Sequence, residues 1–176
     1  MHAAVQVFRE QGFSAPLEEI AAAANVSKGT IFNRLGGRSG LIDAVIDDVV
    51  AAELQAVIEE ARSVVEIRER IRGYVAALRD LQYRRPAVND VLLQEYRDSE
   101  QLLALCHVGT AFHDDLVARG HAAGVLVHDF TPADFQALVR DNALALKHGG
   151  RPPRADYDRR TVFVLDGICS SSSASV

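Results

Sequence analysis

The chain has 176 residues and a mass of 19.1 kDa, which is the length of one or two domains. Apolar residues make up 48% of it and charged residues 24%, a composition that excludes collagen-like and disordered proteins. The net charge is −5, and no apolar stretch reaches the roughly 18 residues that cross a bilayer, so we expect neither a nucleic-acid-coating protein nor an integral membrane protein.

Apolar residues recur at helical spacing along most of the chain, and no strand-length alternation is evident, so we expect an all-α protein. Proline, glycine and capping residues such as Pro16, Ser27 and Thr131 mark the expected helix ends. The expected helices cover residues 3–11, 16–24, 27–34, 38–62, 65–83, 88–97, 99–122, 132–148 and 156–169. The last seven residues, SSSSASV, are typical of a disordered tail.

The second and third of these helices form a helix-turn-helix pattern, with Asn25 and Val26 in the turn. Asparagine tolerates the left-handed backbone conformation that such a turn needs. The apolar residues expected to lock the two helices together are Ile20, Ala21, Val26, Ile31 and Leu35. The second helix of such a pair enters the major groove of DNA, where it reads base edges.

The charge around this second helix is opposite to that of the rest of the chain. Residues 27–38 carry a net charge of +3, whereas residues 41–176 hold 15 basic and 21 acidic residues. Lys28 can reach a guanine or a phosphate, and Asn33 can read an adenine edge. Arg34 and Arg38 are expected at phosphates, which fix register without reading sequence. The alternative interpretation is a helical hairpin with a solvated basic face.

The segment FREQGFSAPLEEIAAAANVSKGTIFNRLGGRSGLIDAVI resembles the N-terminal domain of the TetR/AcrR family of transcriptional regulators. The resemblance rests on the patterns F-x-x-x-G-F, L-x-x-I-A and V-S-K-G-T-I-F, followed by a helix restart at R-x-x-L. It covers about a quarter of the chain. The residues that match the DNA-contacting motif of the family are Ser27, Lys28, Gly29, Thr30, Phe32, Asn33, Arg34 and Arg38.

The resemblance implies a homodimeric repressor that binds a palindromic operator in double-stranded DNA and is released by a small-molecule effector. It implies a three-helix DNA-binding domain at residues 1–46, a larger helical effector-binding and dimerisation domain at 47–169, and the tail at 170–176. The only cysteines, Cys106 and Cys169, are too few for a disulfide framework, so we expect a cytoplasmic protein. We also expect no membrane attachment.

Two departures from the family pattern support an alternative function. Phe32 stands where the family usually has a tyrosine that hydrogen-bonds a phosphate, and Met1 falls inside the first helix, so that helix is expected to be truncated. A loss of phosphate contacts lowers the affinity for any DNA sequence. The alternative is therefore a helical sensor or interaction module that has lost DNA binding.

The larger domain contains candidate residues for an apolar effector pocket with a few polar groups. These candidates are Tyr74, Tyr96, Cys106, His107, Phe112 and His113. The alternative for each is an ordinary core or surface role. The sequence does not identify the effector.

The last two expected helices carry enough apolar surface for a two-fold dimer interface. Val162 to Leu165 are apolar on every side of one turn, which requires burial on more than one side. The candidate interface residues are Phe135, Leu138, Val139, Leu146, Val162, Phe163 and Ile168. The alternative is a terminal helix that packs only within its own domain.

Enzymatic and metal-dependent functions have little support in the sequence. There is no nucleophile elbow, P-loop or dinucleotide fingerprint. No histidines are spaced four residues apart, and there is no C-x-x-C motif. We therefore expect no catalytic residue, metal or cofactor.

Overall fold

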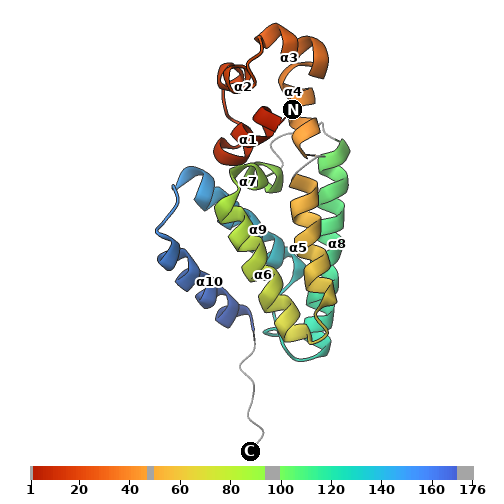
Figure 1. Ribbon diagram of the computed structural model, residues 1–176. Coiled ribbons are helices and arrows are strands. Elements are labelled where there is room, and N and C mark those ends of the chain that lie inside the picture. The colour runs from red at the N-terminus through yellow and green to blue at the C-terminus, as the bar shows by residue number, and fades with distance from the viewer. Residues whose placement is uncertain (1, 47–49, 94–99, 170–176) are drawn as a thin grey trace, which may run out of the picture.

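The computed structural model describes residues 2–46, 50–93 and 100–169, and these residues form ten helices (Figure 1). The helices are α1 (His2–Gln11), α2 (Leu17–Ala23), α3 (Lys28–Leu35), α4 (Gly37–Val45), α5 (Ala51–Ser63), α6 (Ile67–Arg84), α7 (Pro86–Leu92), α8 (Glu100–Ala122), α9 (Pro132–His148) and α10 (Arg154–Ile168). The described part of the chain has no β-strand, which confirms the all-α fold class. None of the described helices is long and apolar enough to span a membrane.

Helices α1–α4 form a small group at one end of the molecule, here called the N-terminal bundle (Figure 1). Its core contains Phe8, Phe13, Ile20, Ile31 and Leu41, all of them at most 5% exposed. The rings of Phe8 and Phe13 meet edge to face with centroids 5.4 Å apart, so they join α1 to the segment that leads into α2.

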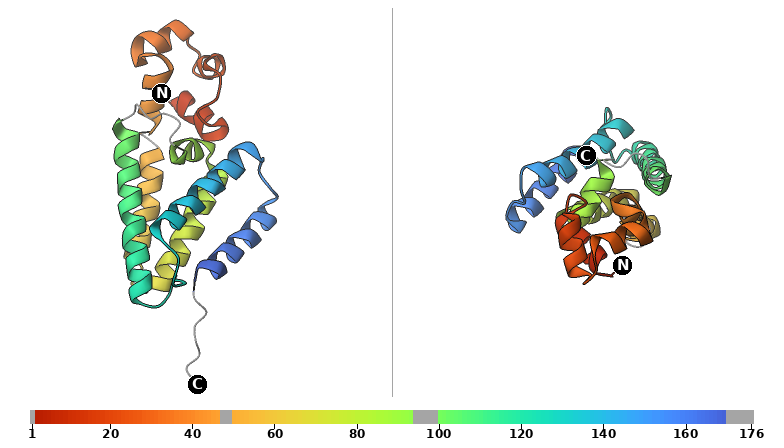
Figure 2. Two further views of the ribbon diagram at one scale, coloured as in Figure 1. Left: turned by 180° about the vertical axis from the view of Figure 1, so that it is seen from behind. Right: turned by 90° about the horizontal axis from the view of Figure 1, so that it is seen from above.

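Helices α5–α10 form the larger C-terminal bundle, which is built around α6. The two opposite views in Figures 1 and 2 place α5 and α8 on one side of α6 and α10 on the other. Ile71, Tyr74, Val75, Leu78 and Leu81 are buried on α6. Their spacing of three or four residues puts them on the inward faces of the helix, as the sequence pattern predicts.

The capping residues lie where the sequence predicts them. The Ser27 side chain accepts a hydrogen bond from the Thr30 backbone N–H at 3.1 Å, so it caps the start of α3. Gly36 ends α3 in the left-handed conformation, with φ of 73°. Thr131 and Asp134 form a reciprocal capping box at the start of α9.

The observed helices differ from the predicted ones mainly in the middle of the chain. The single helix expected over residues 38–62 corresponds to α4 and α5, and residues 47–49 between them lie outside the described residues. Pro86 begins α7 rather than only ending the preceding helix, because proline fits the first helical position. The expected tail at 170–176 also lies outside the described residues.

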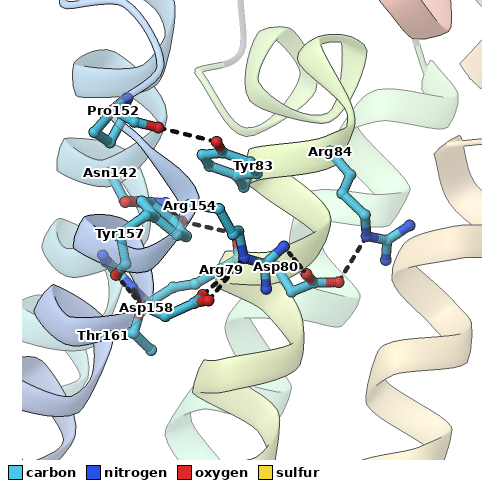
Figure 3. A network of polar contacts seen from close by, with 10 residues as sticks. All are labelled: Arg79, Asp80, Tyr83, Arg84, Asn142, Pro152, Arg154, Tyr157, Asp158 and Thr161. Atoms are coloured by element: carbon cyan, nitrogen blue, oxygen red, sulfur yellow. Dashed lines mark hydrogen bonds and ion pairs between the residues drawn. The ribbon is translucent and has the colours of Figure 1, made fainter.

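A polar network attaches α10 to α6 and α9 (Figure 3). The Asn142 side-chain amide donates to Gln82 Oε1 at 2.7 Å and to the Tyr157 hydroxyl at 2.9 Å. The Tyr157 hydroxyl donates to the Arg79 backbone carbonyl at 2.7 Å, and Arg79 Nε donates to Thr161 Oγ1 at 2.9 Å. Because buried polar groups are costly when unpaired, this network fixes the register of α10 against α6.

The two bundles are joined through the backbone of Phe13, which follows α1. Its N–H donates to the carboxylate of Asp90 on α7, and its carbonyl accepts from the guanidinium of Arg38 on α4. Asp90 is only 3% exposed and also pairs with Lys147 near the end of α9. A Cβ atom at Gly12 would lie 2.7 Å from Asp90 Oδ2, so this close contact requires a glycine.

Candidate DNA-binding surface and ligand cavity

Helices α2 and α3 form a helix-turn-helix. Asn25 adopts φ of 52° in the turn, and the Val26 N–H donates to the Ala21 carbonyl at 3.0 Å. Ile20 and Ile31 are buried between the helices, as expected. Val26 is 40% exposed, which corrects its expected place in the core. Val26 lies in the turn between α2 and α3, directly after the left-handed Asn25, and not on the inward face of either helix.

Most of the candidate DNA-contacting side chains are open to solvent. Ser27, Lys28, Gly29, Phe32, Asn33 and Arg34 are exposed, and Thr30 and Arg38 are half-buried. They lie on or next to α3, at the end of the molecule farthest from the C-terminal bundle (Figure 1). A helix presented in this way can approach a major groove without a clash with the rest of the chain.

The side chains of Ser27, Lys28 and Thr30, at the start of α3, have partners within the N-terminal bundle. The Ser27 and Thr30 hydroxyls lie 3.0 Å apart and hydrogen-bond each other. Lys28 forms an ion pair with Glu18 on α2, and this hydrogen bond lowers the pKa of the Glu18 carboxyl. Both partners of that pair are exposed, so the interaction is weak and Lys28 can exchange Glu18 for a phosphate or a base.

Arg38 and Phe32 are placed differently from the other candidates. One nitrogen of Arg38 donates to the Phe13 carbonyl, so the side chain stabilises the segment after α1, and its other donors remain for a phosphate. Phe32 is 66% exposed, and its ring lies close enough to Gly37 that a Cβ atom there would come within 3.1 Å of it. A phenylalanine at this exposed position has no hydroxyl to donate.

A cavity of about 100 Å³ lies inside the C-terminal bundle, between α5, α6, α7, α8 and α9. Its apolar walls include Leu54, Ile58, Leu78, Val91, Leu92, Leu105 and Val139. Its polar groups are Tyr74, Cys106, Thr110, His113, Gln136 and Arg140. This combination of an apolar lining and a few polar groups is typical of small-molecule sites.

The cavity gathers only part of the predicted pocket. Tyr74, Cys106 and His113 line it. Phe112 is buried beside Tyr74, with ring centroids 4.9 Å apart, and does not line the cavity. His107 is exposed on α8 away from the cavity, and Tyr96 lies outside the described residues. The residues from α5, α7 and α9 were missed, because their helical spacing does not show which of them converge in space.

His113 and Tyr74 form a buried polar pair at the cavity. Its Nε2 lies 2.8 Å from the Tyr74 hydroxyl, and its ring stacks on Phe135 with centroids 4.5 Å apart. Burial lowers the pKa of His113 to about 4 and raises the pKa of Tyr74, so both side chains are neutral at pH 7. In the described part of the chain, no cluster of three His, Cys, Asp or Glu side chains could hold a metal.

Comparison with known proteins identifies the small bundle. Residues 1–45 match the sequence family "Bacterial regulatory proteins, tetR family". The N-terminal bundle is thus similar to the DNA-binding domain of TetR-family regulators. The match ends at the last residue of α4, so it contains the complete helix-turn-helix described above. No curated protein matches the chain.

Solved TetR-family structures match nearly the whole chain. A TetR transcriptional regulator from Streptomyces coelicolor is 26% identical, with a TM-score of 0.61 and 97% of each chain covered. The ketosteroid transcriptional regulator KstR2 of Mycobacterium tuberculosis is 17% identical, with a TM-score of 0.72, 97% of this chain and 93% of that chain covered. FadR from Bacillus subtilis, solved in complex with stearoyl-CoA, is 14% identical, with a TM-score of 0.65, 95% of this chain and 96% of that chain covered. The chain therefore has the fold of TetR-family regulators from α1 to α10.

Within this TetR-family fold, the candidate dimer residues divide into two groups. Phe135, Val139, Leu146 and Ile168 are at most 9% exposed within their own chain, so they pack in the C-terminal bundle itself. Leu138 is half-buried, whereas Val162 and Phe163 on α10 are 47% and 64% exposed. Helical spacing identified apolar faces on both helices correctly but did not distinguish the face turned to the core from the face turned to solvent.

Proposed function

We propose that this protein is a ligand-responsive transcriptional regulator, a homodimeric repressor that binds a palindromic operator and leaves it when a small molecule binds. The exposed face of α3, in a bundle similar to the DNA-binding domain of TetR-family regulators, is the observation that carries the proposal. Lys28 and Asn33 would contact base edges, and Arg34 would contact a phosphate.

Exposed apolar side chains on the last two helices support a dimer. Leu144 on α9 is 42% exposed, and Val162 and Phe163 on α10 are more exposed still. Large exposed apolar groups on neighbouring helices are typical of a protein–protein interface. To read a palindrome, a two-fold dimer formed through this surface has to hold its two recognition helices about 34–36 Å apart, the spacing of successive major grooves.

The cavity and the contact at Phe13 support regulation by a ligand. Helices α7 and α9 both line the cavity. Asp90 on α7 accepts from the Phe13 N–H, and Lys147 on α9 pairs with Asp90, so both helices are connected to the N-terminal bundle. A ligand that shifts α7 would therefore change how the N-terminal bundle sits on the C-terminal one. Such a ligand acts only if it binds the two arrangements with different affinities.

Binding to the intergenic DNA upstream of the protein's own gene tests the proposal. We expect Arg34→Ala to weaken binding of this DNA, measured by fluorescence anisotropy, by about tenfold, since each protomer of the dimer loses a charged contact. Arg119→Ala is the matched control, because Arg119 is an exposed arginine in the last turn of α8, in the C-terminal bundle, and pairs with Asp115.

The outcome separates the two interpretations of the sequence. Equal affinities for the wild type and Arg34→Ala would contradict the assignment of α3 as the recognition helix. No specific binding by the wild type would favour the helical sensor without DNA binding.

A further inference from the structure

His113 has an unused hydrogen-bonding group beside the cavity that its side chain lines. The side chain is 7% exposed and lines the cavity, and its Nδ1 atom has no hydrogen-bond partner among the residues that the structure describes. Its other ring nitrogen is occupied by Tyr74. Because a buried polar atom without a partner is costly, this one is a candidate contact for a bound molecule.

The contact with Tyr74 determines which ring nitrogen of His113 carries the proton. Among the described residues, the Tyr74 hydroxyl has no other hydrogen-bond partner, so its own proton is used only when it donates to Nε2. The reverse arrangement, with Nε2–H donating, leaves both the phenol proton and the Nδ1 lone pair without partners. The favoured neutral tautomer therefore accepts at Nε2 and carries its proton on Nδ1. The wall of the cavity thus contains a fixed, buried N–H donor on His113.

We propose that the cavity binds an uncharged, mainly apolar molecule that presents a carbonyl oxygen to Nδ1 of His113. The proposal deepens the proposed function by naming the chemical class of the effector, and its regulatory meaning rests on that function. Binding itself requires no DNA, so the two are tested separately.

The lining of the cavity explains why the ligand should be uncharged. Among the described residues that line the cavity, Arg140 on α9 is the only charged one, and its side chain is exposed. The groups packed around His113 are the aromatic rings of Tyr74 and Phe135. A carboxylate at Nδ1 would lose its hydration without meeting a buried cation, which is unfavourable. A neutral carbonyl oxygen needs only the single donor that His113 supplies.

The volume limits the part of the ligand that is enclosed. An apolar protein cavity of roughly 150 Å³ accommodates benzene, so about 100 Å³ suits a ring of similar size or smaller. Cyclopentanone is a suitable probe, since it combines a small apolar ring with one carbonyl oxygen. Cyclopentane is its matched control, because it has the same ring without the acceptor.

The test uses the full chain with ¹⁵N-labelled histidine, titrated with each probe by NMR. We expect the Nδ1 resonance of His113 to report a protonated nitrogen and to shift with cyclopentanone but not with cyclopentane. We expect His113→Phe, which keeps a flat ring and removes the donor, to weaken cyclopentanone binding about tenfold and to change cyclopentane binding by less than about threefold. His107→Gln, at an exposed site on the same helix, should leave both unchanged.

Three results would overturn the inference. The first is an Nδ1 atom that carries no proton. The second is an Nδ1 resonance that does not move with cyclopentanone, as when only water occupies the site. The third is equal affinity of the wild type and His113→Phe for cyclopentanone. A protein that binds cyclopentanone through Nδ1 but no operator DNA would retain this inference and contradict the proposed function. A protein that binds operator DNA but gives any of the three results would retain the proposed function and contradict this inference.

Discussion

A single buried histidine links the cavity to the stability of the fold. His113 is enclosed by aromatic rings, and its pKa of about 4 lies well below the usual 6.5 because burial disfavours the charged form. Folding therefore requires the neutral imidazole, whereas the unfolded chain takes up a proton near pH 6.5. Stability contributed by this residue is fully present above that pH and is lost as the pH falls towards the folded pKa.

We expect acidification to destabilise the wild type and to affect His113→Phe less. Between pH 7 and pH 4 the histidine should account for a loss of about 3 kcal/mol in the free energy of unfolding. Urea denaturation at several pH values, followed by circular dichroism, measures this difference. Parallel pH profiles for the two proteins would show that the imidazole is neither buried nor neutral in the folded state.

At the scale of elements, the end of α1 meets α7 in a contact that leaves no room for a side chain. Gly12 has φ of 79°, and Asp90 cannot move aside easily because it accepts from the Phe13 N–H and pairs with Lys147. A β-carbon at this position would therefore meet both an unfavourable backbone conformation and a carboxylate oxygen at 2.7 Å.

We expect Gly12→Ala to lower the free energy of unfolding by about 2–5 kcal/mol, from about 1–2 kcal/mol for the left-handed backbone and about 1–3 kcal/mol for the crowding. Gly150→Ala is the control, since Gly150 has φ of 76° with open space around it. The Gly150→Ala variant should lose only the about 1–2 kcal/mol that comes from the left-handed backbone. Thermal and chemical denaturation of both variants measure the difference. Equal losses in the two variants would mean that Asp90 does not restrict this position.

The sequence predicts these elements well because their ends depend on local chemistry. Ser27 and Thr131 cap helices with their own side chains, and Gly36 takes the left-handed conformation that most residues avoid. Each of these effects involves residues three or four positions apart. The beginning of α10 at Arg154, two residues before the expected Asp156, is a boundary without such a cap.

The sites were predicted less completely because they depend on contacts between distant residues. The helix-turn-helix is contiguous, so its candidate residues could be read along the chain. The cavity joins five helices, and its Arg140 and Val91 lie far from the predicted cluster around His113. The bond from Arg38 to the Phe13 carbonyl spans 25 residues and leaves no signal in the local pattern.

At the scale of the whole molecule, the exposed apolar surface of α9 and α10 leads to a prediction about assembly. We expect Phe163→Glu to yield monomers at concentrations where the wild type is dimeric, because a charge would be buried at the centre of the proposed interface. Sedimentation velocity distinguishes the two. Val65→Glu, at a site 92% exposed before α6, is the control and should not change the assembly. A dimeric Phe163→Glu protein would place the interface elsewhere.

Specific DNA recognition is the central claim, and one titration tests it most directly. Fluorescence anisotropy should compare the DNA upstream of the protein's own gene with a scrambled duplex of the same composition, between about 50 and 200 mM salt. We predict tighter binding of the upstream DNA at every salt concentration, with an affinity that falls as salt rises because phosphate contacts release counterions. Equal affinities for both duplexes, or no binding of either, would contradict the account.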